Sequence, residues 1–196
     1  MTGRISNLPT LRFPKMLLSH PVGAREECFQ YKYSMIYIAY QGIYDGTNFQ
    51  DANTPDQIGR AFNHGFSCMV DVWRVDNQIY LGTDQPLIPV TAEYLRGNRF
   101  WLNASNADMY TWLQSQPPKL YPNYFQFSND TESNTPTTSG GQVIVPGNVP
   151  LAANSIMFIP ERVDRGLLST VKFKCYGVIS NYLSFIKRMR FEGIWF

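Results

Sequence analysis

The chain is poor in the residues that most often carry chemistry or cross-links. Its 196 residues include two histidines, His20 and His64, and three cysteines, Cys28, Cys68 and Cys175. The cysteines are too far apart in sequence for a CxxC metal or redox motif, and three thiols cannot all pair within one chain. We therefore expect reduced, packed thiols, which favours a reducing intracellular compartment.

Long apolar runs are also missing. No run approaches the roughly 18 to 20 residues that a membrane-spanning helix needs. The N-terminal stretch MTGRISNLPTLRFPK lacks the continuous apolar segment and small-residue cleavage site of a secretory signal. Because it is basic and contains no acid before Glu26, an organelle-import signal stays open as an alternative. The sequence predicts no membrane span, and residues 1–34, which lack a sustained periodicity, are expected to form an irregular basic extension.

What the chain does contain is enough apolar surface for a core. Hydrophobic residues make up 44% of the sequence and aromatic residues 15%, which predicts one compact domain over residues 35–196. The net charge of +2 is unevenly distributed, with five Lys/Arg against two acids in residues 1–34, six against twelve in 35–164 and six against one in 165–196. Basic ends suit RNA or another anionic surface, although a solvated face of a last helix explains the C-terminal cations equally well.

The order of apolar segments predicts an α/β fold with a largely parallel sheet. Thr54 and Pro55 have the pattern of an N-cap and first residue of a helix that Gly65 can stop, and Asn106 can start a second helix. The expected strands lie within residues 34–42, 66–73, 78–84, 98–105, 123–130, 143–147, 155–161 and 174–180, and the expected helices within 54–65, 106–116 and 181–190.

Several strand ends carry a pattern found in one enzyme family. The blocks IAYQG (38–42), ANTPDQIGRAFNHGF (52–66), MVDVW (69–73) and LGTDQP (81–86) together resemble the front of a glycerophosphodiester phosphodiesterase, closest to its short uncharacterised branch. Later blocks, including FWLNASN (100–106), NYFQFSND (123–130) and GVISNYL (177–183), are similar to that branch in order and spacing. The resemblance covers about residues 35 to 185. It implies a TIM-barrel-like fold, trimmed relative to the usual barrel of roughly 250 residues, with its site at the carboxyl ends of the strands.

The resemblance also implies a site that has lost its reacting groups. The family's first strand ends Ala-His-Arg-Gly, and here the His and Arg positions are Tyr40 and Gln41. The metal-site Glu of its Glu-Asn-Thr is replaced by Ala52, and the Glu of its Glu-x-Asp is replaced by Met69. The second catalytic His is Thr83. We expect the Tyr40 ring, larger than the imidazole of the family, to fill the old pocket.

The remaining positions point the same way. Where the short branch has a His and a Lys in a later strand, this chain has Asn103 and Ser105. Asp71, Asp84 and Glu161 are retained acids, but Asp71 by itself cannot hold a calcium ion, which takes about six to eight oxygen ligands. We therefore expect no metal and no other cofactor, and expect Asp71 to hydrogen-bond within the old pocket.

The two histidines and the tryptophans offer no replacement site. His20 falls in the extension, and His64 lies at the end of the first helix, where a histidine suits the helix dipole. Trp73 and Trp101 are expected to pack in the barrel rather than to form a ligand platform. The sequence shows no Gly-rich phosphate loop, Ser-His-Asp order or zinc spacing that would indicate another active site.

These observations favour a pseudoenzyme that acts as a structural or interaction subunit of a larger assembly. Its expected partners are protein subunits, with RNA or an anionic surface reached through the basic termini. The settings considered are a virus particle, a mitochondrial ribosome or another organellar complex. Two alternatives stay open, namely a metal-dependent phosphodiesterase that uses Asp71, Asp84 and Glu161, and a binding module for a phosphorylated ligand.

Overall fold

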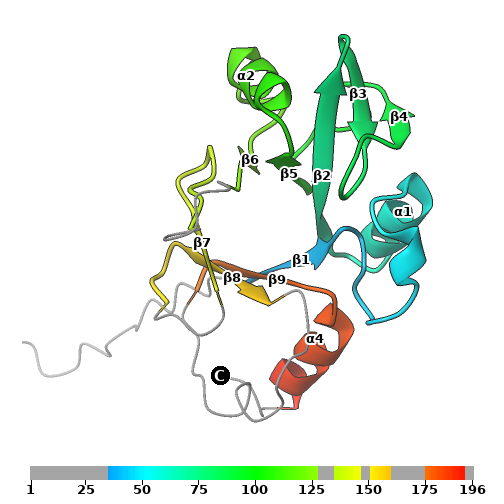
Figure 1. The fold of residues 1–196 in the computed structure, drawn as a ribbon. Helices are drawn as coiled ribbons and strands as arrows, with labels where there is room; N and C mark the ends of the chain where they lie inside the picture. The colour runs from blue at the N-terminus through cyan, green and yellow to red at the C-terminus, as the bar shows by residue number, and fades with distance from the viewer. Residues whose placement is uncertain (1–34, 128–134, 147–150, 160–174, 193–196) are drawn as a thin grey trace, which may run out of the picture. The chain divides into compact units, whose positions relative to one another are not determined.

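A computed structural model of the chain describes residues 35–127, 135–146, 151–159 and 175–192. His20, Cys28, Glu161 and the predicted extension 1–34 lie outside these residues. Within the described ranges are three α-helices and nine strands, and all of them except β4 were expected, in this order (Figure 1). The strands are β1 (Ile36–Tyr40), β2 (Ser67–Val75), β3 (Gln78–Leu81), β4 (Ile88–Val90), β5 (Phe100–Ala104), β6 (Tyr124–Phe125), β7 (Val143–Pro146), β8 (Ser155–Ile159) and β9 (Gly177–Ser180). The helices are α1 (Pro55–Asn63), α2 (Ala107–Ser115) and α4 (Leu183–Phe191), with a 3-10 turn at Phe49–Asp51.

The two predicted helix starts are confirmed. The Thr54 hydroxyl accepts a hydrogen bond from the Gln57 amide at 3.3 Å, and Pro55 is the first residue of α1. The Asn106 side chain accepts from the Met109 amide at 3.0 Å and so caps α2. These caps satisfy amides that have no partner inside the first helical turn. None of the helices in the described ranges is long and apolar enough to cross a membrane.

The sheet is largely parallel, as predicted. Seven strands pair in parallel in the order β7-β8-β9-β1-β2-β5-β6, and β3 and β4 add an antiparallel ribbon on β2. β4 was not predicted, because IPV is short and contains a proline. Pro89 is tolerated there because β4 is an edge strand, where a missing N–H breaks no ladder.

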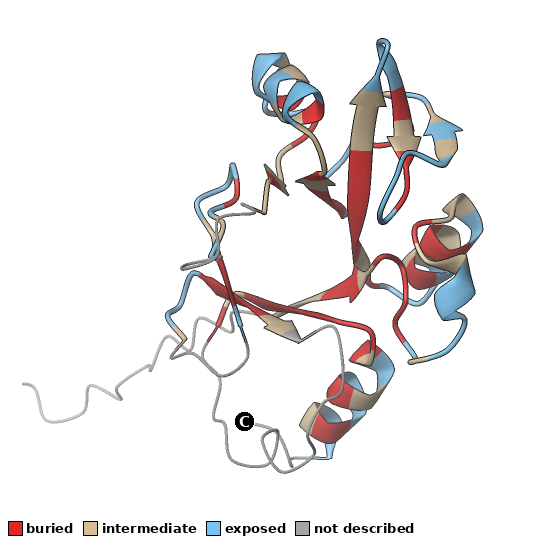
Figure 2. Ribbon diagram, viewed as in Figure 1, coloured by how far each residue is buried: buried red, intermediate tan, exposed pale blue. Residues whose placement is uncertain are grey.

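Alternating residues of the parallel strands divide the core into two clusters. One cluster, the outer cluster, lies between the sheet and the helices. It includes Ala39, Val70 and Leu102 together with Ile58 of α1 and Ile186 of α4. Figure 2 shows the helices with buried residues on one side and exposed residues on the other. The second cluster, the inner cluster, lies on the opposite face of the sheet and takes one buried residue from each parallel strand. Its members are Ile38, Met69, Trp101, Phe125, Ile144, Ile156 and Ile179. Burial on both faces is typical of a parallel sheet.

The second cluster requires the sheet to curl strongly. Neighbouring strands lie about 4.8 Å apart, so β6 and β8, five steps apart in the order, would be separated by about 24 Å in a flat sheet. The Phe127 ring, two residues after β6, instead lies 5.5 Å from the Phe158 ring of β8. The turn that precedes β7 also reaches β6, because the Ser139 amide donates to the Tyr124 carbonyl at 2.8 Å. The two ends of the parallel run therefore approach each other.

Cys68 and Cys175 are free and buried, as expected for packed thiols. Burial raises the pKa of both thiols, most strongly for Cys68 inside the outer cluster. Both are therefore held in the neutral, unreactive form.

Candidate functional site

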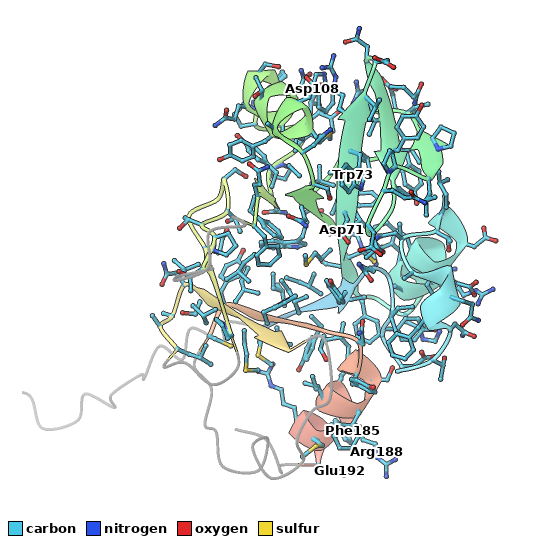
Figure 3. All side chains as sticks on the ribbon, viewed as in Figure 1. Asp71, Trp73, Asp108, Phe185, Arg188 and Glu192 are labelled. Atoms are coloured by element: carbon cyan, nitrogen blue, oxygen red, sulfur yellow. The ribbon has the colours of Figure 1, made fainter. Side chains whose placement is uncertain are left out.

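Asp71, the acid expected to hydrogen-bond at the predicted site, lies in β2 (Figure 3). It follows Met69 by two residues and therefore shares the inner face of the sheet with it. Asn103 of β5 is its direct register partner. Asp71 is buried, with 5% of its surface exposed. A carboxyl group so far from water needs hydrogen-bond donors around it.

Three side-chain amides supply those donors. Gln41 Nε2 donates to Asp71 Oδ2 at 2.7 Å, and Asn53 Nδ2 donates to the same oxygen at 3.1 Å. Asn103 Nδ2 donates to Oδ1 at 2.7 Å. The Asn53 side-chain oxygen in turn accepts from the backbone amide of Asp71 at 3.1 Å. Asp71 thus joins segments that follow β1, precede α1 and end β5.

Thr83 belongs to the same cluster. Its hydroxyl oxygen accepts from Gln41 Nε2 and from Asn53 Nδ2, both at 3.1 Å. The loop that carries it is tied to β2, because Trp73 Nε1 donates to the Gly82 carbonyl at 2.6 Å. The "Asp71 cluster" hereafter denotes Gln41, Asn53, Asp71, Thr83 and Asn103.

Two members of the Asp71 cluster have a left-handed backbone. Gln41 has φ 55° and Asn53 has φ 59°. This conformation is uncommon outside glycine, but asparagine adopts it more readily than most residues. The strained segment is held by backbone bonds from the Gln41 amide to the Met69 carbonyl at 2.7 Å and from the Asn53 amide to the Gln41 carbonyl at 2.9 Å. The geometry places both amide side chains against the Asp71 carboxyl group.

Burial raises the pKa of Asp71 above its ordinary value. Removal of the carboxylate from water is the main cause, and the nearby Asp84 charge adds to it, while the bonds from Asn103, Gln41 and Asn53 act in the opposite direction. None of these three donors is a cation. Amides stabilise a carboxylate by hydrogen bonding alone and give it no opposite charge.

The raised pKa predicts a pH dependence. Because the folded state binds the Asp71 proton more tightly than the unfolded state, this group stabilises the protein fully below the unfolded value of about 3.9. That contribution is lost as the pH rises through the higher folded value. We expect the free energy of unfolding of the wild type minus that of Asp71→Asn to be larger at pH 4 than at pH 8, measured by urea denaturation. A difference that grows with pH would contradict the prediction.

Tyr40 and Met69, two further residues of the predicted site, lie on its apolar side. They are register partners in β1 and β2. Met69 is fully buried in the inner cluster, and the half-buried Tyr40 ring packs edge-on against Phe158 at 5.4 Å. The Phe127 ring, two residues after β6, contacts the same Phe158 ring and extends this row of aromatic contacts. The inner face beside Asp71 is therefore occupied by aromatic rings.

The remaining predicted positions lie around the Asp71 cluster. Ala52 directly precedes Asn53, and Ser105 follows β5, with its amide donating to the Val72 carbonyl at 2.9 Å. Asp84 is exposed and acts on Asp71 only through its charge. The structure thus brings Gln41, Asp71, Thr83 and Asn103 into contact and leaves Ala52, Ser105 and Asp84 at the margin.

Asn53 is the member that sequence reasoning did not single out as a site residue. It lies in the ANTP block, in which Ala52 and the N-cap Thr54 have predicted roles but Asn53 has none. A signal was available, because asparagine is among the residues enriched in left-handed backbone. Only the fold, however, shows that its amide turns to Asp71 rather than to solvent.

The Asp71 cluster has limited chemical capacity. It contains one carboxyl group and no imidazole, ammonium or guanidinium group. Within the described ranges, no three or more His, Cys, Asp or Glu side chains are grouped so that they could hold a metal ion. Phosphate binding usually depends on Arg or Lys donors, which the cluster lacks.

Comparison of the chain with protein-family models, curated proteins and solved structures found no match.

The loop that carries Thr83 offers a direct test of the geometry. A Cβ atom at Gly82 would overlap the Gln85 carbonyl oxygen and lie 3.1 Å from the Leu87 amide nitrogen. Gly82→Ala therefore must move the loop and pull Thr83 from its two donors, and we expect a loss of about 1 to 3 kcal/mol in the free energy of unfolding. The control is Gly59→Ala in α1, which meets no atom within 4 Å and should stabilise by up to about 1 kcal/mol. Equal effects of the two variants in urea denaturation would contradict the assigned loop geometry.

Proposed function

We propose that the chain is a catalytically inactive, phosphodiesterase-like domain that serves as a structural or interaction subunit of a larger assembly. The observation that carries the proposal is the environment of Asp71. In the resembled family, this position helps to hold a divalent cation. Here both carboxyl oxygens accept from neutral amides, at 2.7 to 3.1 Å. The acid is engaged in bonds within the domain.

The neighbouring replacements support the same proposal. The positions of the two catalytic histidines are Tyr40, which packs on Phe158, and Thr83, which accepts two amide hydrogen bonds. A phenol and an alcohol exchange protons poorly near neutral pH, where general acid and base catalysis works best with groups of matching pKa. These side chains stabilise the fold instead of supplying an acid and a base.

We further propose that the seven parallel strands form a trimmed barrel. The contributions of all seven strands to one inner cluster support this, as does the contact between residues after β6 and in β8. Interior-facing side chains from every strand fill the centre of such barrels. In this arrangement, Asp71 and Tyr40 sit at the carboxyl end of the ring, where the family places its site.

The assembly role is supported by the survival of the scaffold around a replaced site. Candidate settings are a mitochondrial ribosome, another organellar complex or a virus particle, with protein subunits as the main partners. RNA contact through the basic C-terminal helix is less favoured by the geometry. In α4, Arg188 is paired with Glu192 at 2.8 Å (Figure 3). Arg190 donates to the Tyr37 hydroxyl at 3.2 Å, and the Lys187 ammonium lies 5.5 Å from the Phe66 ring centre.

The test is purification of the tagged full chain from its native source, with size analysis and mass spectrometry of the associated proteins. Stable recovery in a large particle is the expected result. In parallel, the purified chain is incubated with glycerophosphocholine and Ca²⁺ or Mg²⁺. Metal-dependent hydrolysis that Asp71→Asn abolishes would establish the enzyme alternative and overturn the proposal, as would recovery only as a free monomer.

A further inference from the structure

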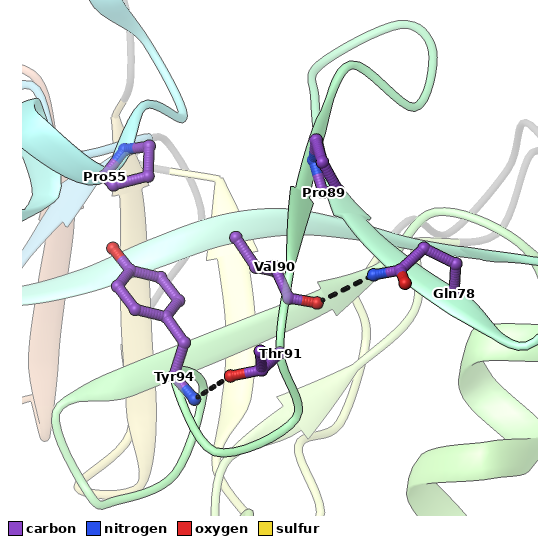
Figure 4. A pocket seen from close by; sticks show the side chains of 6 residues that line it. All are labelled: Pro55, Gln78, Pro89, Val90, Thr91 and Tyr94. Atoms are coloured by element: carbon purple, nitrogen blue, oxygen red, sulfur yellow. Dashed lines mark hydrogen bonds between the residues drawn. The ribbon is translucent and has the colours of Figure 1, made fainter.

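A surface hollow lies between the start of α1 and the β3–β4 ribbon. Its volume is about 480 Å³ and it is open to solvent. This volume falls in the range of roughly 300 to 1,000 Å³ that ligand pockets span. The hollow shares no residue with the Asp71 cluster. Its lining residues, shown in Figure 4, are Pro55, Gln78, Pro89, Val90, Thr91 and Tyr94.

The walls of the hollow are mainly apolar. Pro55 faces the Tyr94 ring from α1, and Val90 and Pro89 line the hollow from β4 (Figure 4). Surfaces of this kind accept the methylene stem of a long side chain, which leaves its polar end free. An aromatic ring such as that of Tyr94 also attracts a cation placed over its face.

The polar groups of the hollow are mostly acceptors. Pro55 and Pro89 have no N–H. Gln78 Nε2 donates to the carbonyls of Ile79 and Val90, both at 3.0 Å, which leaves its side-chain oxygen as the available group. The Tyr94 amide donates to the Thr91 hydroxyl oxygen at 3.2 Å. The Thr91 and Tyr94 hydroxyl groups can donate as well as accept, and together with the Gln78 oxygen they offer acceptors to a ligand that brings several donors.

Two acids that are unpaired within the described ranges lie close in sequence to the lining residues, Asp56 beside Pro55 and Asp76 two positions before Gln78. Of the nearest cations, Arg74 is paired with Asp108, whereas Arg60 lies one turn further along α1. Asp56 follows Pro55 directly, is exposed and takes part in none of the ion pairs found in the described ranges. Burial is the main cause that raises the pKa of the Tyr94 phenol to about 12, and the electrostatic effects of Cys68 and Asp56 add to it. Glu93, by contrast, is paired with Arg96 at 3.0 Å.

We infer that this hollow binds an arginine side chain presented by a basic segment of a partner protein. The inference rests on the interaction role proposed above. The guanidinium group carries five N–H donors and no acceptor, which matches the acceptor-rich walls. It also stacks on aromatic faces and pairs with carboxylates, here those of Tyr94 and Asp56. Addition of a partner strand to β4 fits less well, because Pro89 blunts that edge.

The experiment is an NMR titration of the ¹⁵N-labelled full chain with N-acetyl-arginine N-methylamide. Saturable shifts are expected at the amides of Gln78, Val90, Thr91 and Tyr94. Asp56→Asn is expected to weaken the apparent affinity about three-fold, the size of an exposed charge pair. The matched control is Asp45→Asn, which removes one exposed acid from the segment between β1 and α1 and retains the oxygen that accepts from the Thr47 amide at 3.1 Å.

The other outcomes overturn either the arginine inference or the assembly role on which it rests. Equal shifts with the blocked citrulline analogue, which lacks the positive charge, would assign a neutral ligand. Equal weakening by Asp56→Asn and Asp45→Asn, or shifts spread over all acidic loops, would indicate general charge attraction. If the chain is recovered in a particle but blocked arginine leaves the hollow unshifted, this inference alone fails. If the hollow binds arginine but no particle is found, the assembly role fails instead.

Discussion

Asp71→Ala is expected to destabilise the domain by about 3 kcal/mol. The substitution removes the acceptor of three amide donors that come from different segments of the chain. A buried donor without a partner costs about 1 to 3 kcal/mol. The side-chain nitrogens of Gln41 and Asn53 keep only their bonds to Thr83, and that of Asn103 loses its acceptor. Urea denaturation at neutral pH measures the change in the free energy of unfolding.

The control for this variant is Asp71→Asn. Asparagine has nearly the same shape and keeps one acceptor oxygen, so we expect a loss of only about 1 kcal/mol. The contrast tests whether the carboxyl group serves as a structural acceptor. If Asp71→Ala were neutral or stabilising, the Asp71 cluster would not hold the loops together, and the main support for the proposed inactive domain would be lost.

Trp101→Ala is expected to cost about 3 to 5 kcal/mol, the usual range for removal of a large aromatic ring from a core. Trp101 is 2% exposed and belongs to the inner cluster together with residues of all six other parallel strands. An open, flat sheet would leave one of its faces partly in water, and the same substitution would then cost much less. Thermal and urea unfolding of the purified variant measure the loss.

Trp101→Phe separates packing from hydrogen bonding at the same position. The Trp101 Nε1 group is buried and has no hydrogen-bond partner among the described residues. Phenylalanine removes this unpaired donor and keeps an aromatic ring, so the loss should stay below about 2 kcal/mol. A phenylalanine variant as unstable as the alanine variant would show that the indole N–H, through a bond outside the described residues, contributes more than the ring.

Much of the local structure follows from the sequence. The Thr54 and Asn106 caps act within one helical turn, and the alternation within each strand decides which residues share a face. Both signals depend on residues a few positions apart. This is why the helices and most strands could be predicted from the sequence.

Features that depend on residues far apart in the chain were predicted only in part. Asp71 was expected to hydrogen-bond within the pocket that the resemblance implies, and the structure shows that its carboxyl group accepts from Gln41 and Asn103. The part played by Asn53 was missed, because its side chain reaches Asp71 only after a left-handed backbone turn. The short strand β4 was missed as well, since its pairing with β3 stabilises three residues that have no strand pattern of their own.

The sequence by itself determined the helix starts, the alternation of side chains along the strands and the types of side chain that stand at the expected site. The tertiary structure decided how the sheet curls, which donors surround Asp71 and where the surface hollow forms. The physical reason is distance along the chain. Caps and strand alternation are set by neighbouring residues, whereas the contact of Phe127 with Phe158 and the bond of Asn53 to Asp71 arise only when distant segments pack together.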